Sequence, residues 1–297
     1  MILVSGGTGF VGSHLIPRLA TRDEKIRCLV RSPAKTKTLQ EHGAELALGD
    51  VTDSQSLSAA MHGVDTVIHL VAIIRETRNA TFSKVNAQGT RNVAEAAKAS
   101  GVKRFIHMSA LGASPNPRYR YTYSKWQGEE AVRSSKLDFV IFRPSAIFGQ
   151  GFGYSFIDSM IRSLKILPFI APVPGSGKTR FQPIWVEDVV SCIIQTLENE
   201  KGSQTYEIGG PEHLSYEEML DTVIHAMSMR RVKLHIPIPL MRLAVIAMER
   251  TMSNPPVTSV ELAQLELDNI TDLDSVECRF GFKPLALNQG LDYIKPS

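Results

Sequence analysis

A glycine-rich stretch at residues 5–12 constrains the fold more than any other feature of the sequence. It follows the apolar run at residues 1–4, which predicts a buried strand, and leads into residues 10–20, where apolar positions recur at helical spacing. Glycine permits the positive φ of a tight turn and lets an anion approach the backbone, while the N-terminus of the next helix attracts negative charge. The order strand, glycine turn, helix predicts a turn that binds a nucleotide phosphate; the alternative is a purely structural turn.

Apolar runs and amphipathic segments alternate along the first half of the chain. Strands are expected at residues 1–4, 25–30, 44–48, 64–72, 102–109 and 137–142, and long helices at 10–20 and 82–100. This alternation predicts an α/β fold: a doubly wound parallel sheet with right-handed crossovers. Ligands of such sheets bind beyond the carboxyl ends of the strands, where Asp50, Ala72, Ser109 and Arg143 are expected.

The pattern loosens after residue 144, which indicates a second, smaller lobe. The 297 residues are enough for one large α/β domain and such a lobe. We assign residues 1–149 with about 181–209 to the dinucleotide-binding domain, and about 150–180 with 210–297 to a small, mostly helical substrate-binding lobe.

Composition excludes several classes of protein. With 43% hydrophobic and 21% charged residues the chain is ordinary for a soluble globular protein, and a net charge of +3 does not point to nucleic acid. The three cysteines, Cys28, Cys192 and Cys278, lack metal-ligand spacing, so we expect no metal site, buried thiols and a cytoplasmic location. Because the first expected strand starts the given sequence, we expect no signal peptide. We also expect no membrane span at 234–248, an apolar stretch that is short and interrupted.

The residue that ends the second expected strand bears on the choice of cofactor. NAD-specific domains place a carboxylate there for the ribose 2′-hydroxyl, whereas this chain has Arg31, followed by Ser32 and Pro33. A guanidinium suits a 2′-phosphate because it makes bidentate, charge-assisted hydrogen bonds. Ser32 is expected to cap the next helix, with Pro33 in its first turn. The sequence therefore favours NADP(H) over NAD(H); the alternative is that Arg31 is only a surface cation.

One tyrosine has the spacing of a catalytic acid/base. Among Tyr119, Tyr121 and Tyr123, only Tyr121 has a lysine four positions later, Lys125, which places both side chains on one helix face. A nearby ammonium favours the phenolate and lowers the phenol pKa from about 10. The phenol then exchanges a proton with a carbonyl or alcohol during hydride transfer. The alternative is a surface tyrosine and a solvated lysine.

Several motifs occur together in a characteristic order. They are Gly6-x-x-Gly9-x-x-Gly12, Asp50-Val51, Asn86-x-x-Gly89-Thr90-x-Asn92, Tyr121-x-x-x-Lys125, Arg143-Pro144 and Val186-Glu187-Asp188-Val189. In combination they resemble the extended and atypical short-chain dehydrogenases/reductases, the NAD(P)-dependent epimerase/dehydratase superfamily, over most of residues 1–215. The chain looks closest to the subgroup related to the accessory subunit of respiratory complex I that has this fold.

The resemblance implies roles for individual residues. Asp50 would contact the adenine, Tyr121 would be the acid/base and Lys125 would hold the nicotinamide ribose. Asn86 would steady the helix beside the site, with a capping or surface asparagine as the alternative. Ser109 is a third catalytic candidate, because the residue after it, where the family usually has serine or threonine, is alanine here. The residues expected to contact the cofactor are Gly6, Thr8, Gly9, Phe10, Val11, Gly12, Arg31, Ser32, Asp50, Val51, Leu70, Val71, Ala72, Met108, Lys125 and Pro144.

The second lobe bears on the substrate. Trp185 stands where epimerases of the family usually have histidine, and Arg180 is one residue early for their substrate-phosphate arginine, so a nucleotide sugar is disfavoured. Apolar residues of the lobe favour an isoprenoid, quinone or steroid-like substrate; the alternative is that they form the lobe's core. These residues are Phe148, Phe152, Tyr154, Phe156, Ile157, Met160, Leu167, Phe169 and Ile170, and, in a helical stripe, Leu240, Leu243, Ala244, Ile246, Ala247 and Met248.

We therefore expect an NADP(H)-dependent oxidoreductase acting on an apolar carbonyl, alcohol or quinone-like small molecule. Two alternatives stay open: an epimerase or isomerase on the same scaffold, and a dinucleotide-bound structural or sensor subunit with little turnover. We expect a monomer or homodimer that binds no nucleic acid. We also expect no stable membrane insertion, although a lipophilic substrate would explain weak association with a membrane surface.

Overall fold

The computed structural model describes residues 1–297 except 23, 35, 152–154, 200–201, 253–254 and 296–297. Contacts divide the chain into two units, Met1–Pro144 with Val189–Glu207, and Ser145–Asp188 with Ile208–Ser297. Residues 145–149 and 181–188, which we expected in the dinucleotide-binding domain, belong to the second unit. The reason lies in two short strands of these segments, β7 (Ile147–Phe148) and β10 (Ile184–Trp185), which pair with each other.

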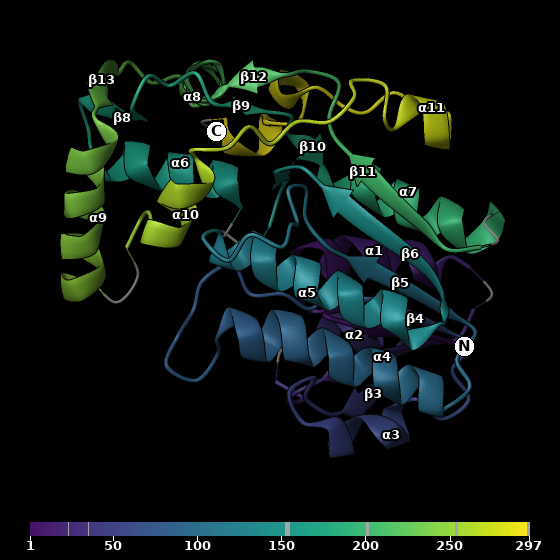
Figure 1. The fold of residues 1–297 in the computed structure, drawn as a ribbon. Coiled ribbons are helices and arrows are strands. Elements are labelled where there is room, and N and C mark those ends of the chain that lie inside the picture. The colour runs from purple at the N-terminus through teal and green to yellow at the C-terminus, as the bar shows by residue number, and fades with distance from the viewer. Residues whose placement is uncertain (23, 35, 152–154, 200–201, 253–254, 296–297) are drawn as a thin grey trace. The chain divides into compact units, whose positions relative to one another are not determined.

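The first unit is built on a seven-stranded sheet with the order β11-β6-β5-β4-β1-β2-β3 (Figure 1). Its strands are β1 (Ile2–Ser5), β2 (Ile26–Val30), β3 (Glu45–Leu48), β4 (Thr66–His69), β5 (Arg104–Met108), β6 (Asp138–Pro144) and β11 (Gln204–Ile208). Strands β1 to β6 pair in parallel, as buried apolar runs joined by helices require. The predicted doubly wound α/β fold is confirmed. The strand order reverses between β1 and β4, and ligands of such sheets bind at this reversal.

Helices lie on both faces of this sheet, with α4 and α5 in front of it and α1 behind it in Figure 1. The helices of this part of the chain are α1 (Phe10–Ala20), α2 (Lys37–Glu41), η1 (Ser54–Ser56), α3 (Leu57–Ala60), η2 (Ser83–Gln88), α4 (Gly89–Ala99), α5 (Arg120–Ser135) and α7 (Val186–Asn199). Leu15, Ile16 and Leu19 are buried, so the helical spacing of apolar residues after the glycine turn marks the face of α1 that packs inward.

The helix expected at 82–100 is present, as the π-helical segment η2 followed directly by α4. Two other local expectations about the first unit are wrong. Strand β4 ends at His69 rather than at residue 72. Ser32 does not cap a helix, because α2 begins only after Thr36. Instead the Ser32 hydroxyl accepts a hydrogen bond from the Ala34 amide at 3.2 Å, which forms a turn.

The second unit has a core of its own. Its further elements are α6 (Phe156–Ile166), β8 (Ile170–Pro174), β9 (Arg180–Phe181), β12 (Leu214–Ser215), α8 (Tyr216–Ala226), β13 (Val232–Ile236), α9 (Ile238–Thr251), α10 (Ser259–Gln264), α11 (Glu277–Phe280), η3 (Leu287–Gln289) and η4 (Asp292–Ile294). Ser215 and Glu218 form a capping box at the start of α8. Phe148, Ile157 and Met160 are buried in this core, which agrees with the alternative that apolar residues of the lobe form its core rather than line a substrate pocket. Phe152 and Tyr154 lie outside the described residues.

Two expectations from composition can be compared with the structure. Cys28 and Cys192 are buried as expected, but Cys278 is exposed, because it lies on the short surface helix α11. No helix among the described residues is long and apolar enough to cross a membrane.

Candidate functional site

The glycine turn between β1 and α1 has the geometry of an anion cradle. Gly6 has a φ of +88°, and its carbonyl accepts a hydrogen bond of 2.9 Å from the Gly9 amide. A Cβ on Gly12 would come within 2.2 Å of the Gly6 carbonyl oxygen, so no larger residue fits there. No side chain caps α1, whose first turn starts at Phe10, so its N-terminal amides are open to an anion. The turn therefore fits the pyrophosphate of a dinucleotide.

The end of β4 lies directly against this turn. The Leu70 amide donates to the Ser5 carbonyl at 2.9 Å, and a Cβ on Gly6 would lie 3.1 Å from the Val71 amide nitrogen. Leu70 and Val71 are partly buried and Ala72 is exposed. Thr8 is exposed on the turn itself, while Phe10 and Val11 are partly buried in the first turn of α1. The structure thus brings most of the expected cofactor contacts to one edge of the sheet.

The expected contacts at β2 and β3 lie on the same side of the sheet. Arg31 and Ser32 follow β2 and are exposed, and no ion pair between the described residues involves Arg31. Asp50 follows β3, and one of its oxygens accepts hydrogen bonds from the Thr52 amide at 2.8 Å and the Thr52 hydroxyl at 2.9 Å. Val51 is buried. These bonds fix the Asp50 carboxylate at the strand end where adenosine would lie.

Helix α5 carries both residues of the Tyr-x-x-x-Lys motif. Lys125 is buried, and its Nζ donates to the carbonyl of Met108, the last residue of β5, at 2.6 Å. Burial lowers the pKa of Lys125 to about 8, against the opposing charge of Glu129. The lysine therefore places its ammonium at the carboxyl end of the central strands, where a bound ribose is expected.

Tyr121 corrects one expectation. The partly buried ring packs edge-on against Phe82 with 5.8 Å between centroids, and burial raises the pKa of Tyr121 to about 12. The predicted lowering by Lys125 is wrong for the chain by itself, because the ammonium is bonded to Met108 and burial dominates the pKa. Among the described residues no hydrogen bond joins the Tyr121 hydroxyl to Lys125 or to Ser109.

The third catalytic candidate is held by a residue that sequence reasoning missed. The Ser109 hydroxyl donates to Glu129 Oε1 at 2.5 Å, and Glu129 is fully buried. Arg143 reaches the same carboxylate through two hydrogen bonds of 2.8 and 2.7 Å, and Arg133 through one of 2.9 Å. Burial alone would raise the pKa of Glu129, but the bonds from Arg143 and Ser109 outweigh it and hold that pKa below its ordinary value. Glu129 lies four residues after Lys125, so helical spacing was the available signal.

Buried polar residues behind the site tie the loop after β4 to the helices. Asn86, on the π-helical segment η2, binds both the amide and the carbonyl of Ile73, at 2.8 and 3.0 Å, and donates to the Ser124 hydroxyl at 3.1 Å. The alternative of a capping or surface asparagine is therefore wrong. His69 lies between the hydroxyls of Ser5 and Thr90, at 2.6 and 3.0 Å.

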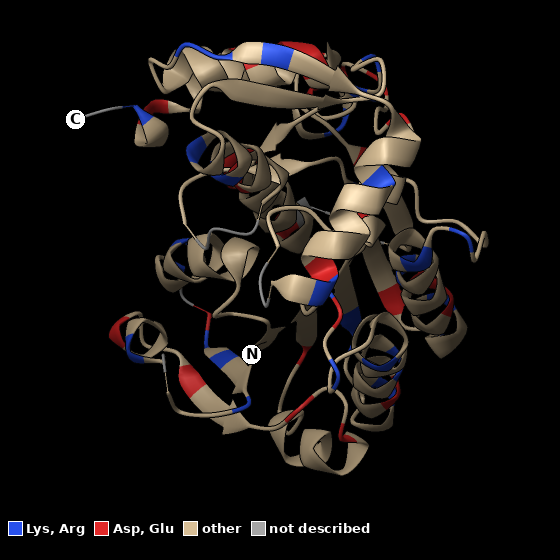
Figure 2. Cartoon of the chain, turned by 90° about the vertical axis from the view of Figure 1, so that its left-hand side faces the viewer, with Lys and Arg blue, Asp and Glu red and all other residues tan. Residues whose placement is uncertain are grey.

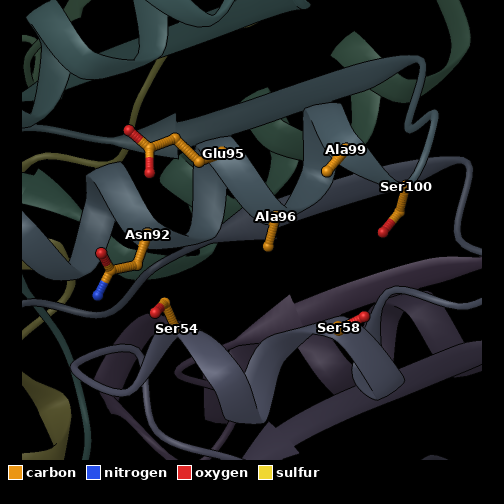
Figure 3. Close-up of a pocket in the computed structure, with 7 residues that line it drawn as sticks. All are labelled: Ser54, Ser58, Asn92, Glu95, Ala96, Ala99 and Ser100. Atoms are coloured by element: carbon orange, nitrogen blue, oxygen red, sulfur yellow. The ribbon is translucent and has the colours of Figure 1, made fainter.

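A groove lies between α3 and α4 (Figure 3), and its Asn92 donates a hydrogen bond of 2.8 Å to the carbonyl of Val51. It is lined by Ser54, Ser58, Asn92, Glu95, Ala96, Ala99 and Ser100. None of them is an expected site residue, and the groove has no cation that would hold a phosphate. The groove is therefore not the candidate site.

Comparison with known proteins places this geometry in a family. Residues 2–209 match the model of the NAD dependent epimerase/dehydratase family, and the match includes the glycine turn, Tyr121 and Lys125. The chain belongs to the NAD-dependent epimerase/dehydratase family. As in our expectation from the sequence motifs, its relatives include subunits of respiratory complex I.

The relatives of this chain are named for different activities. The chain is 32% identical over 246 residues to the Arabidopsis thaliana protein NADH dehydrogenase [ubiquinone] 1 alpha subcomplex subunit 9, mitochondrial, covering 79% of this chain and 60% of that one. It is 35% identical over 196 residues to ceramide reductase of Caulobacter vibrioides, covering 65% of this chain and 60% of that one. The chain thus spans less than two thirds of either relative. The structure of the Escherichia coli NADPH-dependent quinone oxidoreductase with NADPH has a TM-score of 0.78 at 17% identity, covering 99% of both chains, and shows the fold alone.

Two residues of the second unit that bear on our expectation about a nucleotide-sugar substrate have partners within the protein. Trp185 packs against Phe148 with 5.3 Å between ring centroids. Arg180 makes three hydrogen bonds to Asp268, of 2.9 Å from its amide, 2.9 Å from Nε and 2.6 Å from its terminal nitrogen. The guanidinium is therefore engaged within the protein.

Proposed function

We propose that the chain is an NADP(H)-dependent oxidoreductase that acts on an apolar carbonyl, alcohol or quinone-like substrate. The observation that carries the proposal is the placement of Tyr121 and Lys125 at the start of α5, with Lys125 bonded to the end of β5. In a sheet of this order that edge is the ligand-binding edge. The glycine turn at the same edge fits the pyrophosphate.

Each residue then has a stated task. Amides of the turn at Gly6, Gly9 and Gly12 hold the pyrophosphate, and Arg31 binds the 2′-phosphate. The bound nicotinamide supplies or accepts the hydride. Tyr121 passes the accompanying proton to or from the substrate oxygen at its hydroxyl. Lys125 holds the ribose and brings positive charge to the site, which favours the phenolate against the cost of burial.

The preference for an apolar substrate rests on the second unit and on the relatives. Arg180 is bound to Asp268, and Trp185 replaces the histidine usual in epimerases of the family, so neither residue supports binding of a nucleotide sugar. The 35% identical relative is named ceramide reductase, so its name gives a reduction and a lipid substrate for that protein. Both points favour reduction of a lipophilic molecule.

Thermal unfolding of the NADPH complex tests the substrate class. Lipophilic quinones or ketones are expected to raise the melting temperature of the complex, because a ligand that binds only the folded state stabilises it. Nucleotide sugars are the control ligands and should leave the melting temperature unchanged. Stabilisation by a nucleotide sugar alone would reverse the proposal and favour the epimerase alternative.

A second candidate function is a dinucleotide-bound subunit with little turnover. The hydroxyl of Ser109 is committed to Glu129, the next residue is Ala110, and burial raises the pKa of Tyr121, all of which weaken proton transfer. One relative is a named subunit of an NADH dehydrogenase. The absorbance of the purified protein distinguishes this function from that of an oxidoreductase. A tightly retained dinucleotide that no added quinone or ketone oxidises would support the function as a subunit.

A further inference from the structure

Strands β8 and β13 of the second unit form a two-stranded parallel sheet with one uncovered face. Ala171 and Val173 of β8 are fully buried and belong to the core. The register pairs Ile170 with Val232 and Pro172 with Leu234. Because neighbouring positions on a strand point to opposite faces, these residues share the face away from the core. Val232 is 72% exposed and Leu234 48%, so this face is apolar and uncovered.

Helix α9 follows β13 directly and is apolar on two sides. Val245 is buried and Met241 and Met248 pack against the core, so they mark the inward side. Leu240 and Leu243, on the outward side, are 59% and 66% exposed. A helix of a globular protein ordinarily places charged residues on such a side. Figure 2 turns α9 toward the viewer, and most of its length carries neither Lys or Arg nor Asp or Glu. These segments follow one another or pair with each other, and we call their exposed apolar residues, taken together, the apolar face: Phe169, Ile170, Val232, Leu234, Leu240 and Leu243.

The segments that carry the apolar face are strongly basic. Residues 159–179 and 228–252 contain eight of the 33 Lys and Arg residues of the chain but one of its 30 Asp and Glu residues. That single acid, Glu249, is bonded to the amide and hydroxyl of Ser259. In the part of the chain that the structure describes, no ion pair involves Lys165, Arg230 or Arg250. Two other cations of these segments are paired, Lys233 with Glu217 and Asp221, and Arg242 with Glu266. Three cations near the apolar face, Lys165, Arg230 and Arg250, thus have no ion-pair partner among the described residues.

Charge decides which occupant fits the apolar face. A second copy would place the same basic segments against each other in a two-fold interface, which like charges disfavour. A bilayer with anionic lipids offers hydrocarbon for the apolar residues and phosphate for the cations. Phe169, between α6 and β8, is 79% exposed, the most exposed large apolar side chain of the described residues.

We propose that the apolar face docks the protein on the surface of a membrane that contains anionic lipids. Phe169 and the outward side of α9 enter the boundary between headgroups and acyl chains, while Lys165, Arg230 and Arg250 lie against lipid phosphate. The inference goes beyond the proposed function, since it requires no particular reaction. It would also place the enzyme where an apolar substrate is dissolved.

Sedimentation of the full chain with vesicles tests the docking. Vesicles of phosphatidylcholine with phosphatidylglycerol should bind the protein, pure phosphatidylcholine vesicles should bind it far less, and added salt should weaken binding. Phe169→Ser with Leu243→Ser should lower binding at least about tenfold, and Arg250→Gln about fivefold, as expected for one cation at an anionic surface. Leu273→Ser is the matched control, because Leu273 is a 51% exposed leucine of the same unit that lies outside the apolar face.

Depth of insertion is a second, independent readout. Phe169→Trp should show blue-shifted emission on the anionic vesicles and quenching by lipids with brominated acyl chains, relative to the wild type, whereas Leu273→Trp should show neither. Circular dichroism of every variant verifies the fold, so this test stays separate from that of the proposed function.

Several results would overturn the docking proposal. Equal binding to neutral vesicles, absence of binding to both kinds of vesicle, or binding that the face variants leave unchanged each contradicts it. A dimer in sedimentation velocity that Leu243→Ser dissociates would assign the apolar face to a second copy, and salt-sensitive capture of an acidic peptide without vesicle binding would assign it to a protein partner.

Discussion

Beyond the carboxyl end of β2 lies Arg31, the residue that our proposal makes responsible for the choice between the two dinucleotides. The side chain is exposed and the backbone around it turns through the bond between the Ser32 hydroxyl and the Ala34 amide. No acidic partner among the described residues holds the guanidinium. It is therefore available to a 2′-phosphate, which it would bind in bidentate fashion.

Replacing Arg31 should change cofactor preference and little else. Wild-type protein is expected to bind NADPH more tightly than NADH, and Arg31→Ala should lose about tenfold or more of the NADPH affinity, since such charge-assisted bonds contribute about 1.5–3 kcal/mol. Nicotinamide fluorescence titration measures both affinities. Lys37→Ala, which removes a 90% exposed cation of the following helix, is the control. Equal affinities in the wild type that Arg31→Ala leaves unchanged would exclude the NADP(H) preference.

At the scale of elements, Glu129 joins α5 to two strands. Its buried carboxylate accepts hydrogen bonds from Ser109, which follows β5, and from Arg143 of β6, as well as from Arg133 of its own helix. The bidentate pair raises the pKa of Arg143, chiefly through the Glu129 hydrogen bonds. The network fixes the helix that carries Tyr121 and Lys125 against the sheet.

Removing the charge of Glu129 should destabilise the fold strongly. Glu129→Gln leaves Arg143 partly buried without its main partner, and breaking a buried ion pair from one side costs about 3–5 kcal/mol of unfolding free energy. The neighbouring Glu130 pairs with Arg133 at the surface with its side chain 49% exposed, so Glu130→Gln should change stability by less than about 0.5 kcal/mol. Denaturant unfolding at neutral pH measures both. Similar losses in the two variants would show that the network does not hold α5.

Two histidines on neighbouring strands give the sheet a pH dependence. His69 of β4 and His107 of β5 are buried and stacked, with 5.4 Å between ring centroids. Burial first, and the charge of Lys125 second, lower the pKa of His69 to about 3 and hold that of His107 well below its ordinary value. Both rings therefore resist protonation in the folded protein below the pH at which a free histidine takes up a proton.

The sign of the effect follows from the unfolded chain, in which a histidine has a pKa of about 6.5. Above that pH the pair contributes nothing to the pH dependence. Below it the unfolded state binds protons at these histidines and the folded state does not, so the free energy of unfolding falls as pH falls from about 6.5 toward about 3. Between pH 7 and pH 5 each histidine should cost about 2 kcal/mol. His107→Phe, which keeps an aromatic ring, should show about that much less loss over this range, and exposed His225→Phe should behave as the wild type. An unchanged loss in His107→Phe would contradict the argument.

At the scale of the whole chain, the sequence predicts the first unit well and its details less well. Buried apolar runs between amphipathic helices mark the strands, and the glycine spacing marks the turn, because both patterns follow from local burial and backbone geometry. The end of β4 and the π-helical turn around Asn86 were missed, since they depend on which backbone groups find partners in the fold. In the second unit, burial of Phe148 and exposure of Phe169 were not separable from the sequence, which gives both as apolar.

The candidate site, too, was predicted from the sequence only in part. Spacing along one helix placed Tyr121 and Lys125 together, whereas the bond of Lys125 to Met108 and the commitment of Ser109 to Glu129 join segments far apart in the sequence. The shift in the pKa of Tyr121 was predicted least well. A neighbouring ammonium was expected to lower the Tyr121 pKa, but in the folded chain burial raises it. Burial of an individual side chain is a property of the packed structure rather than of the motif.

The central claim is that Tyr121 is the acid/base of an NADP(H)-dependent oxidoreductase, and consumption of NADPH with a panel of lipophilic quinones and ketones tests it most directly. Tyr123→Phe, a change two residues away on the same helix, is the matched control. The wild type and Tyr123→Phe should consume NADPH, while Tyr121→Phe should be about 10²–10⁴-fold slower with NADPH affinity nearly unchanged, because only the proton-transfer group is lost. Equal rates in Tyr121→Phe and the wild type, or no consumption of NADPH by the wild type with any member of the panel, would contradict the claim.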